Sequence, residues 1–231
     1  MSEWQNRYTV RRFDRTYIPE KHIIDQVKET VQYIPSQLGA VDHMWCLLGP
    51  QDQTIKDWLV EKIYFCDDSR TGHREYFSAL ADAPYMFTSF QVIVPNSVDF
   101  DLTDKEMEFY RVPKVNEYRR NNAFHAGVLV SQGLKYNLDC CQIACTEGWS
   151  DELLQDYQTL LWNRFSDSLS KISIKFTNGE IRFSKNTIGV ALMSVGMGKG
   201  LPHTENNFTP YNDGVTFTGQ KPKKWFSNIV D

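Results

Sequence analysis

A short antiparallel hairpin is the feature of this sequence that most constrains its fold. Apolar and polar residues alternate from Ile172 to Phe176 and again from Ile181 to Phe183, which is the two-residue period of a strand with one buried face. Between the two runs stands Asn178-Gly179, a pair favoured in tight hairpin turns. An antiparallel pair of this kind argues against a purely parallel sheet.

The rest of the chain alternates between helical and extended patterns. Apolar residues at helical spacing predict four helices, and short apolar or β-branched runs predict four strands. The helices are expected from Pro19 to the residue before Pro35, over Ile55–Tyr64, over Asn116–Asn137 and after a cap at Ser150, and the strands over Met44–Leu48, Tyr85–Val94, Cys140–Cys145 and Ile188–Val195. Such an order predicts an α+β fold, an α/β sandwich in which helices flank a sheet.

Composition narrows the class of protein. The 231 residues are 41% hydrophobic and 23% charged, which is ordinary for a globular protein, so we expect a single domain over residues 1–231. The net charge of −4 gives no reason to expect a nucleic-acid partner, since binding to a polyanion needs a basic surface. No apolar run approaches the roughly 20 residues of a membrane span, and we expect a soluble protein without a membrane partner.

The cysteines indicate a reducing compartment. Five of them, an odd number that includes the adjacent pair Cys140-Cys141, make a poor disulfide framework, so we expect a cytoplasmic protein. Cys140, Cys141 and Cys145 could bind a metal, but they lack paired Cys-x2-Cys spacing. Buried free thiols are the expected alternative, and no metal site is predicted.

A basic stretch opens the chain. In an extended backbone Arg7, Thr9 and Arg11 would point the same way, with Tyr8 between the first two. Two guanidinium groups and a hydroxyl suit a phosphate, whose oxygens they can bind bidentately. The alternative is a solvated basic face without a ligand.

Several short motifs give this stretch a context, because they occur in the order typical of one family. The opening resembles the Arg-x-Ser-x-Arg-x-Phe motif of the nitroreductase-like flavoproteins, with Thr9 in place of serine. The other motifs that follow in family order are Pro35-Ser36, Ala83-Pro84, Thr146-Glu147-Gly148, Ser194-Val195-Gly196 and the basic Lys221-Pro222-Lys223-Lys224. The resemblance implies a mixed, mainly antiparallel central sheet flanked by helices, in an intertwined homodimer that binds FMN.

The same resemblance implies roles for particular residues. The flavin phosphate would be held by the opening stretch and the basic tail, and the ring edge by Asn121 and by the backbone of Glu147-Gly148. The turn formed by Pro35, Ser36 and Gln37 would reach the flavin of the other subunit. The implied cofactor-binding residues are Arg7, Tyr8, Thr9, Arg11, Pro35, Ser36, Gln37, Asn121, Glu147, Gly148, Lys221 and Lys223. Taken alone, Glu147-Gly148 is equally typical of a plain turn between a strand and a helix.

The long helix predicted over Asn116–Asn137 carries small residues. Ala126 and Gly127 would allow a second helix or a ligand to approach closely, and we expect them to lie at the dimer contact. A tightly packed core helix would explain the same residues.

The sequence also departs from the family pattern. Where many members continue the turn with Asn-x-Gln-Pro-Trp, residues 39–45 read Gly-Ala-Val-Asp-His-Met-Trp, so the asparagine position is glycine and tryptophan arrives two residues late. Residues 95–114 are expected to be a mobile insertion or a disordered loop. Residues 172–183 are expected to be an additional hairpin, and residues 200–231 a C-terminal extension.

The sequence contains no motif typical of a catalytic site formed by side chains alone. It contains no Gly-x-Ser-x-Gly elbow, no phosphate-binding glycine loop, and no histidines at ligand spacing, so a cofactor is expected to carry the chemistry. The predicted function is an FMN-dependent oxidoreductase that moves hydride from NADH or NADPH through flavin N5 to a nitroaromatic, quinone or related acceptor. The alternatives are a flavin-binding or storage module without turnover, and a relative that degrades flavin or removes halogens.

Overall fold

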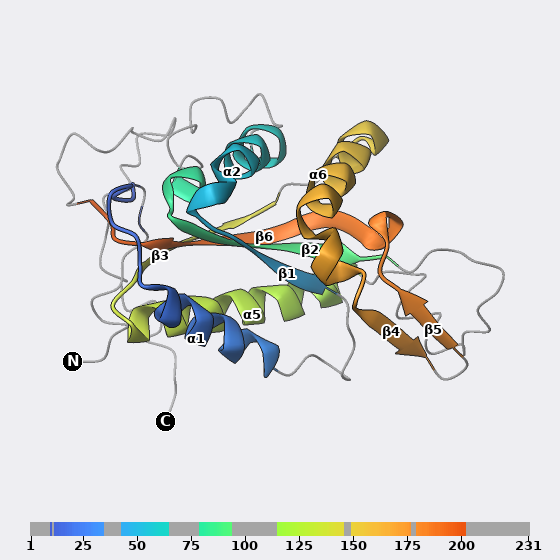
Figure 1. The fold of residues 1–231 in the computed structure, drawn as a ribbon, viewed down its shortest axis with the longest axis horizontal. Helices are drawn as coiled ribbons and strands as arrows, with labels where there is room; N and C mark the ends of the chain where they lie inside the picture. Colours follow the sequence, from blue (N-terminus) through green and yellow to red (C-terminus); the bar gives the residue numbers. More distant parts are fainter. Residues whose placement is uncertain are drawn as a thin grey trace, which may run out of the picture.

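A computed structural model of the chain describes residues 10, 12–34, 43–64, 79–93, 115–145, 149–176 and 179–201. Within these ranges a four-stranded antiparallel sheet forms the centre of the molecule (Figure 1). Its strands lie in the order β1 (His43–Leu48), β2 (Tyr85–Val92), β6 (Ile188–Gly198) and β3 (Asp139–Ala144). All three pairings between them are antiparallel.

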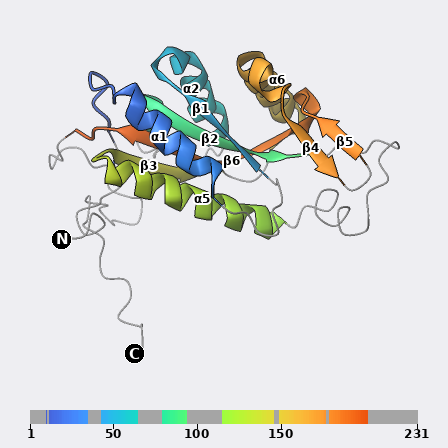
Figure 2. The same cartoon turned by 60° about the horizontal axis from the view of Figure 1, so that its bottom comes forward.

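Helices cover both faces of this sheet, as Figures 1 and 2 show. One face carries α1 (Lys21–Gln32) and the long α5 (Val115–Lys135); the other carries α2 (Gln53–Leu59) and α6 (Asp151–Leu169). A π-helical turn, η4 (Val60–Tyr64), continues α2. The predicted α+β fold, with helices on either side of a mainly antiparallel sheet, is confirmed.

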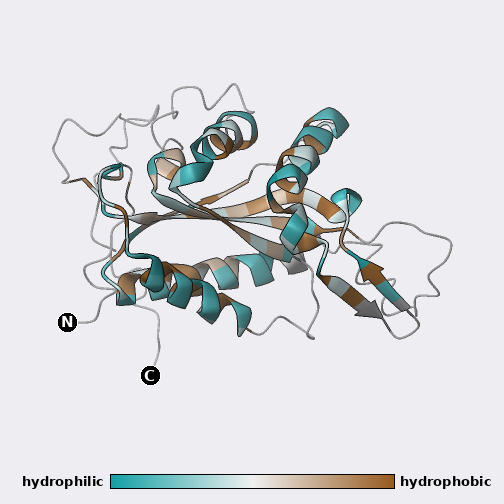
Figure 3. Cartoon of the chain, viewed as in Figure 1, coloured by the Kyte–Doolittle hydropathy of each residue, from teal (hydrophilic) through white to brown (hydrophobic). Residues whose placement is uncertain are grey.

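Each face of the sheet has its own hydrophobic core, because neighbouring residues of a strand point to opposite sides. We call the core under α2 and α6 the α6-side core and the one under α1 and α5 the α5-side core. Leu48, Met86 and Phe90 are fully buried in the first, and Phe87 and Val195 in the second. Figure 3 shows the apolar residues gathered on the strands and on the inner sides of the helices.

Local signals placed the helices well. Ser150 caps α6 as predicted, and its hydroxyl accepts a hydrogen bond from the backbone N–H of Leu153 at 3.1 Å, which satisfies one of the free donors of the first turn. The prediction started α1 too early: Glu20 is its N-cap and the helix begins at Lys21. The predicted helix over Ile55–Tyr64 is α2 together with η4.

The hairpin that the sequence predicted is present as β4 (Ser173–Phe176) and β5 (Gly179–Arg182). Phe176 pairs with Gly179, so the glycine belongs to the second strand and not, as the sequence predicted, to the turn. The buried Ile174 and Phe183 join the α6-side core, which explains why only one side of the hairpin is apolar.

The strand β6 is longer than predicted and reaches Gly198 instead of Val195. Its last residues are paired on both sides, with Met197 opposite Tyr85 of β2 and Cys140 of β3. A Cβ atom at Gly198 would lie 2.6 Å from a side-chain atom of Pro84. The close approach of that proline explains the glycine at this position.

The cysteines in the described ranges are free thiols. Cys140 and Cys141 are both buried. Cys140 joins the α5-side core, whereas Cys141 packs with Val10 and Phe13, because adjacent strand residues point to opposite faces. This adjacent pair therefore cannot chelate one metal ion. None of the described helices combines the length and apolar composition that crossing a membrane requires.

Candidate functional site

Of the predicted cofactor-binding residues, the structure describes Asn121. The others lie outside the described ranges: Arg7, Tyr8, Thr9, Arg11, Pro35, Ser36, Gln37, Glu147, Gly148, Lys221 and Lys223. So do the whole of the predicted 95–114 insertion and, apart from residues 200 and 201, the C-terminal extension. The described residues that adjoin these segments still give the site a frame.

The first part of the frame is the place where the basic opening stretch enters the fold. The backbone N–H of Val10 donates to the carbonyl of Cys140 at the start of β3, over 3.3 Å. Phe13 pairs with Gly200, and the N–H of Leu201 donates to the carbonyl of Arg12 at 3.0 Å (Figure 1). The first and the last described residues thus lie side by side, next to β3.

Packing fixes this junction. Val10 and Phe13 are 1% and 2% exposed, whereas Arg12 is exposed. Packing therefore buries the two apolar residues of this stretch, whereas Arg12 stays in contact with solvent. The backbone N–H of Gly200 donates to a carboxylate oxygen of Asp139 at 2.7 Å, which further ties the end of β6 to the start of β3.

A second part of the frame lies at the first half of α5. Asn121 is half-buried, and its neighbour Asn122 is 1% exposed. The Nδ2 group of Asn122 donates to the hydroxyl of Ser89 on β2 at 2.8 Å. That hydroxyl also accepts from the backbone N–H of Met193 at 3.0 Å and donates to the carbonyl of Met193 at 2.8 Å.

This network has a structural cause. The register between β2 and β6 shifts between Thr88 and Phe90, and a shift of this kind disturbs the regular ladder of backbone hydrogen bonds. The Ser89 side chain bonds both backbone groups of Met193 at that point and links them to α5. Asn121 is therefore carried by a helix turn that is anchored to the middle of the sheet.

The third part is a cavity of about 290 Å³ on the α5 side of the sheet. It lies between α1, β1 and α5, and its described lining is Lys28, Val31, Gln32, His43, Met44, Trp45, Leu47, Phe87 and His125. His125 stands four residues after Asn121, so the two side chains share one face of α5. The cavity thus opens beside the helix face that carries the predicted ring contact.

Two histidines meet in the wall of this cavity. The Nε2 atom of His43 lies 2.9 Å from the Nδ1 atom of His125, so the two rings share a hydrogen bond. Their exposed fractions are 7% and 8%. The indole of Trp45 stands edge-on to His43, with ring centroids 6.3 Å apart.

Spacing in the sequence did not predict this histidine pair. His43 and His125 are 82 residues apart, and spacing rules detect only ligands that are close in sequence. One indirect signal existed: counted from Gly39, His43 stands where many of the resembling family members have tryptophan. A polar ring at that position requires a buried partner, and His125 is that partner.

Comparison with known proteins adds independent information on the fold. A scan against models of protein families and a search of curated proteins both gave no match. Solved structures do match. The FMN-dependent nitroreductase from Clostridium difficile R20291 superposes with a TM-score of 0.51 at 12% sequence identity, covering 87% of this chain and 88% of that one.

Nitroreductase CinD from Lactococcus lactis matches to a similar degree. Its complex with nicotinic acid gives a TM-score of 0.52 and its complex with chloramphenicol 0.51, both at 12% identity and covering 88% of this chain and 91% and 90% of CinD. At such identity the likeness shows the fold. The chain therefore has the nitroreductase-like fold that its motifs implied.

Proposed function

We propose that this chain is an FMN-dependent oxidoreductase of the nitroreductase kind, with NADH or NADPH as donor and a nitroaromatic, quinone or related compound as acceptor. The observation that carries the proposal is the agreement of two independent signals. The short motifs follow one family order along the chain, and the fold resembles that of an FMN-dependent nitroreductase at only 12% identity.

The available donor groups fit the cofactor. Arg7, Thr9 and Arg11 offer two guanidinium groups and a hydroxyl to a phosphate, and Val10, which stands between Thr9 and Arg11, is fixed to β3. Lys221 and Lys223 would add positive charge from the other end of the chain. Bound FMN would supply the redox chemistry by accepting a hydride at N5 and passing two electrons on.

The ring would be oriented by groups of this chain on both sides. Asn121 on α5 and the backbone of Glu147-Gly148 beyond β3 are the proposed contacts. Glycine suits the second position because the main chain has to approach the ring closely. We propose the same role as in the resembling family for Pro35, Ser36 and Gln37, which would reach the flavin of a partner subunit.

The choice of donor and acceptor has support from a structural relative. CinD is described in complexes with nicotinic acid, which has the ring of a nicotinamide nucleotide, and with chloramphenicol, which is a nitroaromatic compound. These ligands belong to CinD. For this chain they define the compounds that should be tested first.

The first experiment is a visible spectrum of the purified protein. Flavin absorption should be present or appear on addition of FMN, and it should bleach when NADH or NADPH is added without oxygen. Colourless protein that ignores FMN would refute the proposal. Bound FMN without oxidation of NADH or NADPH, whichever of several acceptors is present, would favour a flavin-binding module without turnover. The replaced Asn-x-Gln-Pro-Trp segment supports this alternative.

A pair of neighbouring arginines provides a sharper test. Arg11→Ala should weaken FMN binding by roughly ten- to a hundredfold, since a lost charge-assisted contact costs about 1.5–3 kcal/mol. Arg12→Ala is the matched control because Arg12 is exposed.

Riboflavin lacks the phosphate, so Arg11→Ala should remove the preference for FMN, whereas Asn121→Ala should weaken both flavins alike. Equal FMN affinity in the two arginine variants would make the opening stretch a solvated basic face.

We also propose a two-fold homodimer, in the cytoplasm, with two equivalent flavin sites at its interface. Large apolar side chains are exposed on the α1 and α5 layer, where Tyr33 is 77% and Phe124 57% exposed. Ala126 does not contribute to such a surface, because it is fully buried in the α5-side core. Light scattering that finds an FMN-loaded monomer would contradict this assembly.

A further inference from the structure

A buried lysine of α2 holds the turn that leads into β2. Lys56 is 1% exposed, and its ammonium donates to the carbonyl of Ala83 at 2.7 Å and to that of Pro84 at 3.4 Å. Both residues belong to the segment 79–84, which begins as a helical turn and which we call the bridging turn. Carbonyls at the end of a helical turn lack backbone partners, so the buried ammonium satisfies them and they in turn stabilise its charge.

A second side chain of α2 contacts the same turn. The side-chain amide of Gln53 donates to the carbonyl of Ala81 at 2.9 Å. Gln53 and Lys56 stand about one helical turn apart on α2 and therefore share a face of the helix. That face of α2 holds the backbone of the bridging turn through both side chains.

The opening stretch of the chain packs against the bridging turn as well. Val10 and Phe13 form one buried cluster with two side chains of the turn, those of Ala79 and Ala83. The turn therefore lies between α2, which holds its backbone, and the apolar residues of the opening stretch (Figure 1). Because protein interiors are close-packed, a displacement of the turn has to displace Val10 and Phe13 too.

An ion pair joins the opening stretch to the bridging turn at the surface. The Nε group of Arg15 donates to the carboxylate of Asp82 at 3.0 Å, but the Arg15 side chain is 70% exposed. Exposed ion pairs contribute little to stability. The buried contacts, and Lys56 above all, are therefore expected to fix the turn.

We propose that Lys56 is a positioning residue for the phosphate-binding stretch. By holding the bridging turn it fixes Val10 and Phe13, and with them the neighbouring side chains proposed to bind the FMN phosphate. The ammonium acts through the turn and the apolar cluster, because it is itself buried in the fold. Its effect on FMN rests on the proposed function, whereas its effect on Val10 and Phe13 does not.

The first experiment needs no flavin. Hydrogen exchange is measured in the flavin-free, full-length protein for the backbone N–H of Val10, which donates to Cys140, and for that of Leu161 in the α6-side core. Lys56→Met should speed up exchange at Val10 by about threefold or more beyond any change at Leu161, since it breaks the network that holds the opening stretch. A loss of global stability would accelerate both amides by the same factor, and that result would overturn the proposal.

The second experiment measures the preference for FMN over riboflavin, which lacks the phosphate. Each flavin is titrated into flavin-free protein, and the two dissociation constants are obtained from flavin fluorescence. Lys56→Met should reduce their ratio by about threefold or more, because displaced phosphate ligands affect FMN alone. The matched control is Lys62→Met, which removes an exposed lysine just after α2 and should leave the ratio unchanged. An unchanged ratio in folded Lys56→Met would overturn the proposal.

A milder variant keeps the test decisive if Lys56→Met fails to fold. Gln53→Ala removes the other contact of α2 with the bridging turn and introduces a good helix former. It should shift the exchange of Val10 and the flavin ratio in the same direction, by about twofold; no shift in either would overturn the proposal. If the unaltered protein binds no FMN, the proposed function fails, and the exchange of Val10 still decides the role of Lys56.

Discussion

The two faces of the sheet bury polar groups in different ways. On the α6 side charged groups are buried and paired within the fold, besides the neutral Thr88 and Ser194. The carboxylate of Asp52 binds the guanidinium of Arg164 at 2.5 Å, and the ammonium of Lys56 donates to the carbonyl of Ala83 at 2.7 Å. On the α5 side the buried polar side chains are Asn122, Ser89 and the histidine pair, and the two histidines line a cavity.

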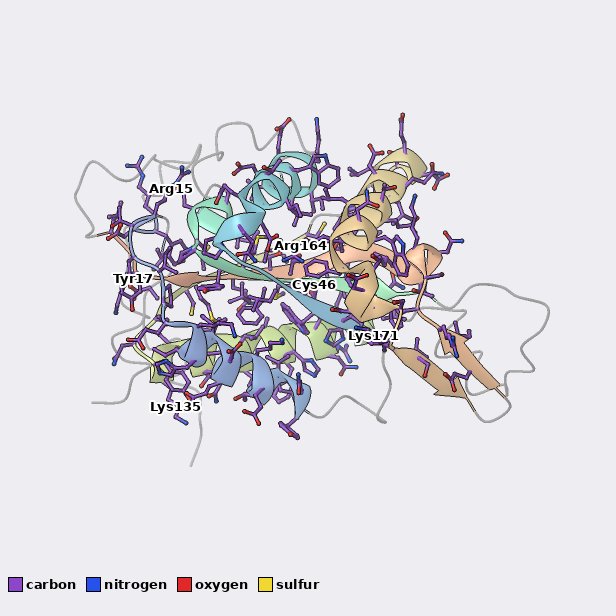
Figure 4. All side chains as sticks on the ribbon, in the orientation of Figure 1. Arg15, Tyr17, Cys46, Lys135, Arg164 and Lys171 are labelled. Carbon is purple, nitrogen blue, oxygen red and sulfur yellow. The ribbon has the colours of Figure 1, made fainter. Side chains whose placement is uncertain are left out.

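This difference separates structural from candidate functional chemistry. Figure 4 shows Arg164 of α6 close to Cys46 of β1, which belongs to the α6-side core, whereas Arg15 lies at the periphery. Burial raises the pKa of the Cys46 thiol to about 12, so this thiol stays protonated and is a poor nucleophile near neutral pH. The α6 side therefore has the character of a stabilising core, and the candidate site is expected on the α5 side.

The largest expected effect tests the charged pair of the α6 side. Asp52 is 5% exposed and also accepts a hydrogen bond from the backbone N–H of Gly49 at 2.9 Å. Asp52→Ala should lower the free energy of unfolding by about 3 kcal/mol, because it leaves the partly buried Arg164 without its carboxylate. Urea unfolding measures the change.

The control for this substitution is an exposed ion pair. Arg15 bonds Asp82, but its side chain is 70% exposed, so Arg15→Ala should cost no more than about 1 kcal/mol. If Asp52→Ala and Arg15→Ala cost the same, the buried pair is not a stabilising element and the contrast between the two faces is lost.

Lys56 provides a test through pH. Burial lowers the pKa of its ammonium from 10.5 to about 8. Between these values the unfolded chain binds more protons than the folded one, so this group makes the fold more stable as pH rises from 8 to 10.5, by up to about 3 kcal/mol. The free energy of unfolding, compared with that of Lys56→Met at pH 7.5 and pH 10, should show this gain only in the unaltered protein. Parallel pH profiles would mean that Lys56 keeps its ordinary affinity for protons.

A smaller effect is expected where α5 packs on the sheet. A Cβ atom at Gly133 would lie 2.7 Å from the sulfur of Cys140 and 3.5 Å from the side chain of Met197. Gly133→Ala should therefore destabilise the protein by about 1–3 kcal/mol, the usual cost of overpacking a core. Thermal unfolding measures this loss. An unchanged melting temperature would show that the side chains around Gly133 can shift to accommodate the added methyl group.

The smallest effect concerns Gly127 of the same helix. A Cβ atom there meets nothing within 4 Å, so Gly127→Ala should stabilise the chain by about 0.5–1 kcal/mol through helix propensity. The same variant tests the proposed dimer. If Gly127 lies at a close contact between subunits, light scattering should show weaker association; unchanged association would place the contact elsewhere on α5.

The sequence by itself determined the positions of most described elements. The alternation at 172–183 predicted β4 and β5, the helical spacing of Ile24 and Val27 predicted α1, and Ser150 marked the start of α6. These signals are local: a strand or helix buries one face, and its period is written in consecutive residues. The order of the short motifs also pointed to the fold that the structure shows.

Only the tertiary structure decided which polar residues meet. Asp52 and Arg164 are 112 residues apart, and His43 and His125 are 82 apart, so neither pair leaves a periodic or local signature. The sequence likewise could not indicate that Asn122, next to the predicted Asn121, is the amide anchored to the sheet. Such contacts follow from strand order and helix placement. A long-range pair forms only after the chain has closed around a core, and the physical chemistry of each residue alone does not select its partner.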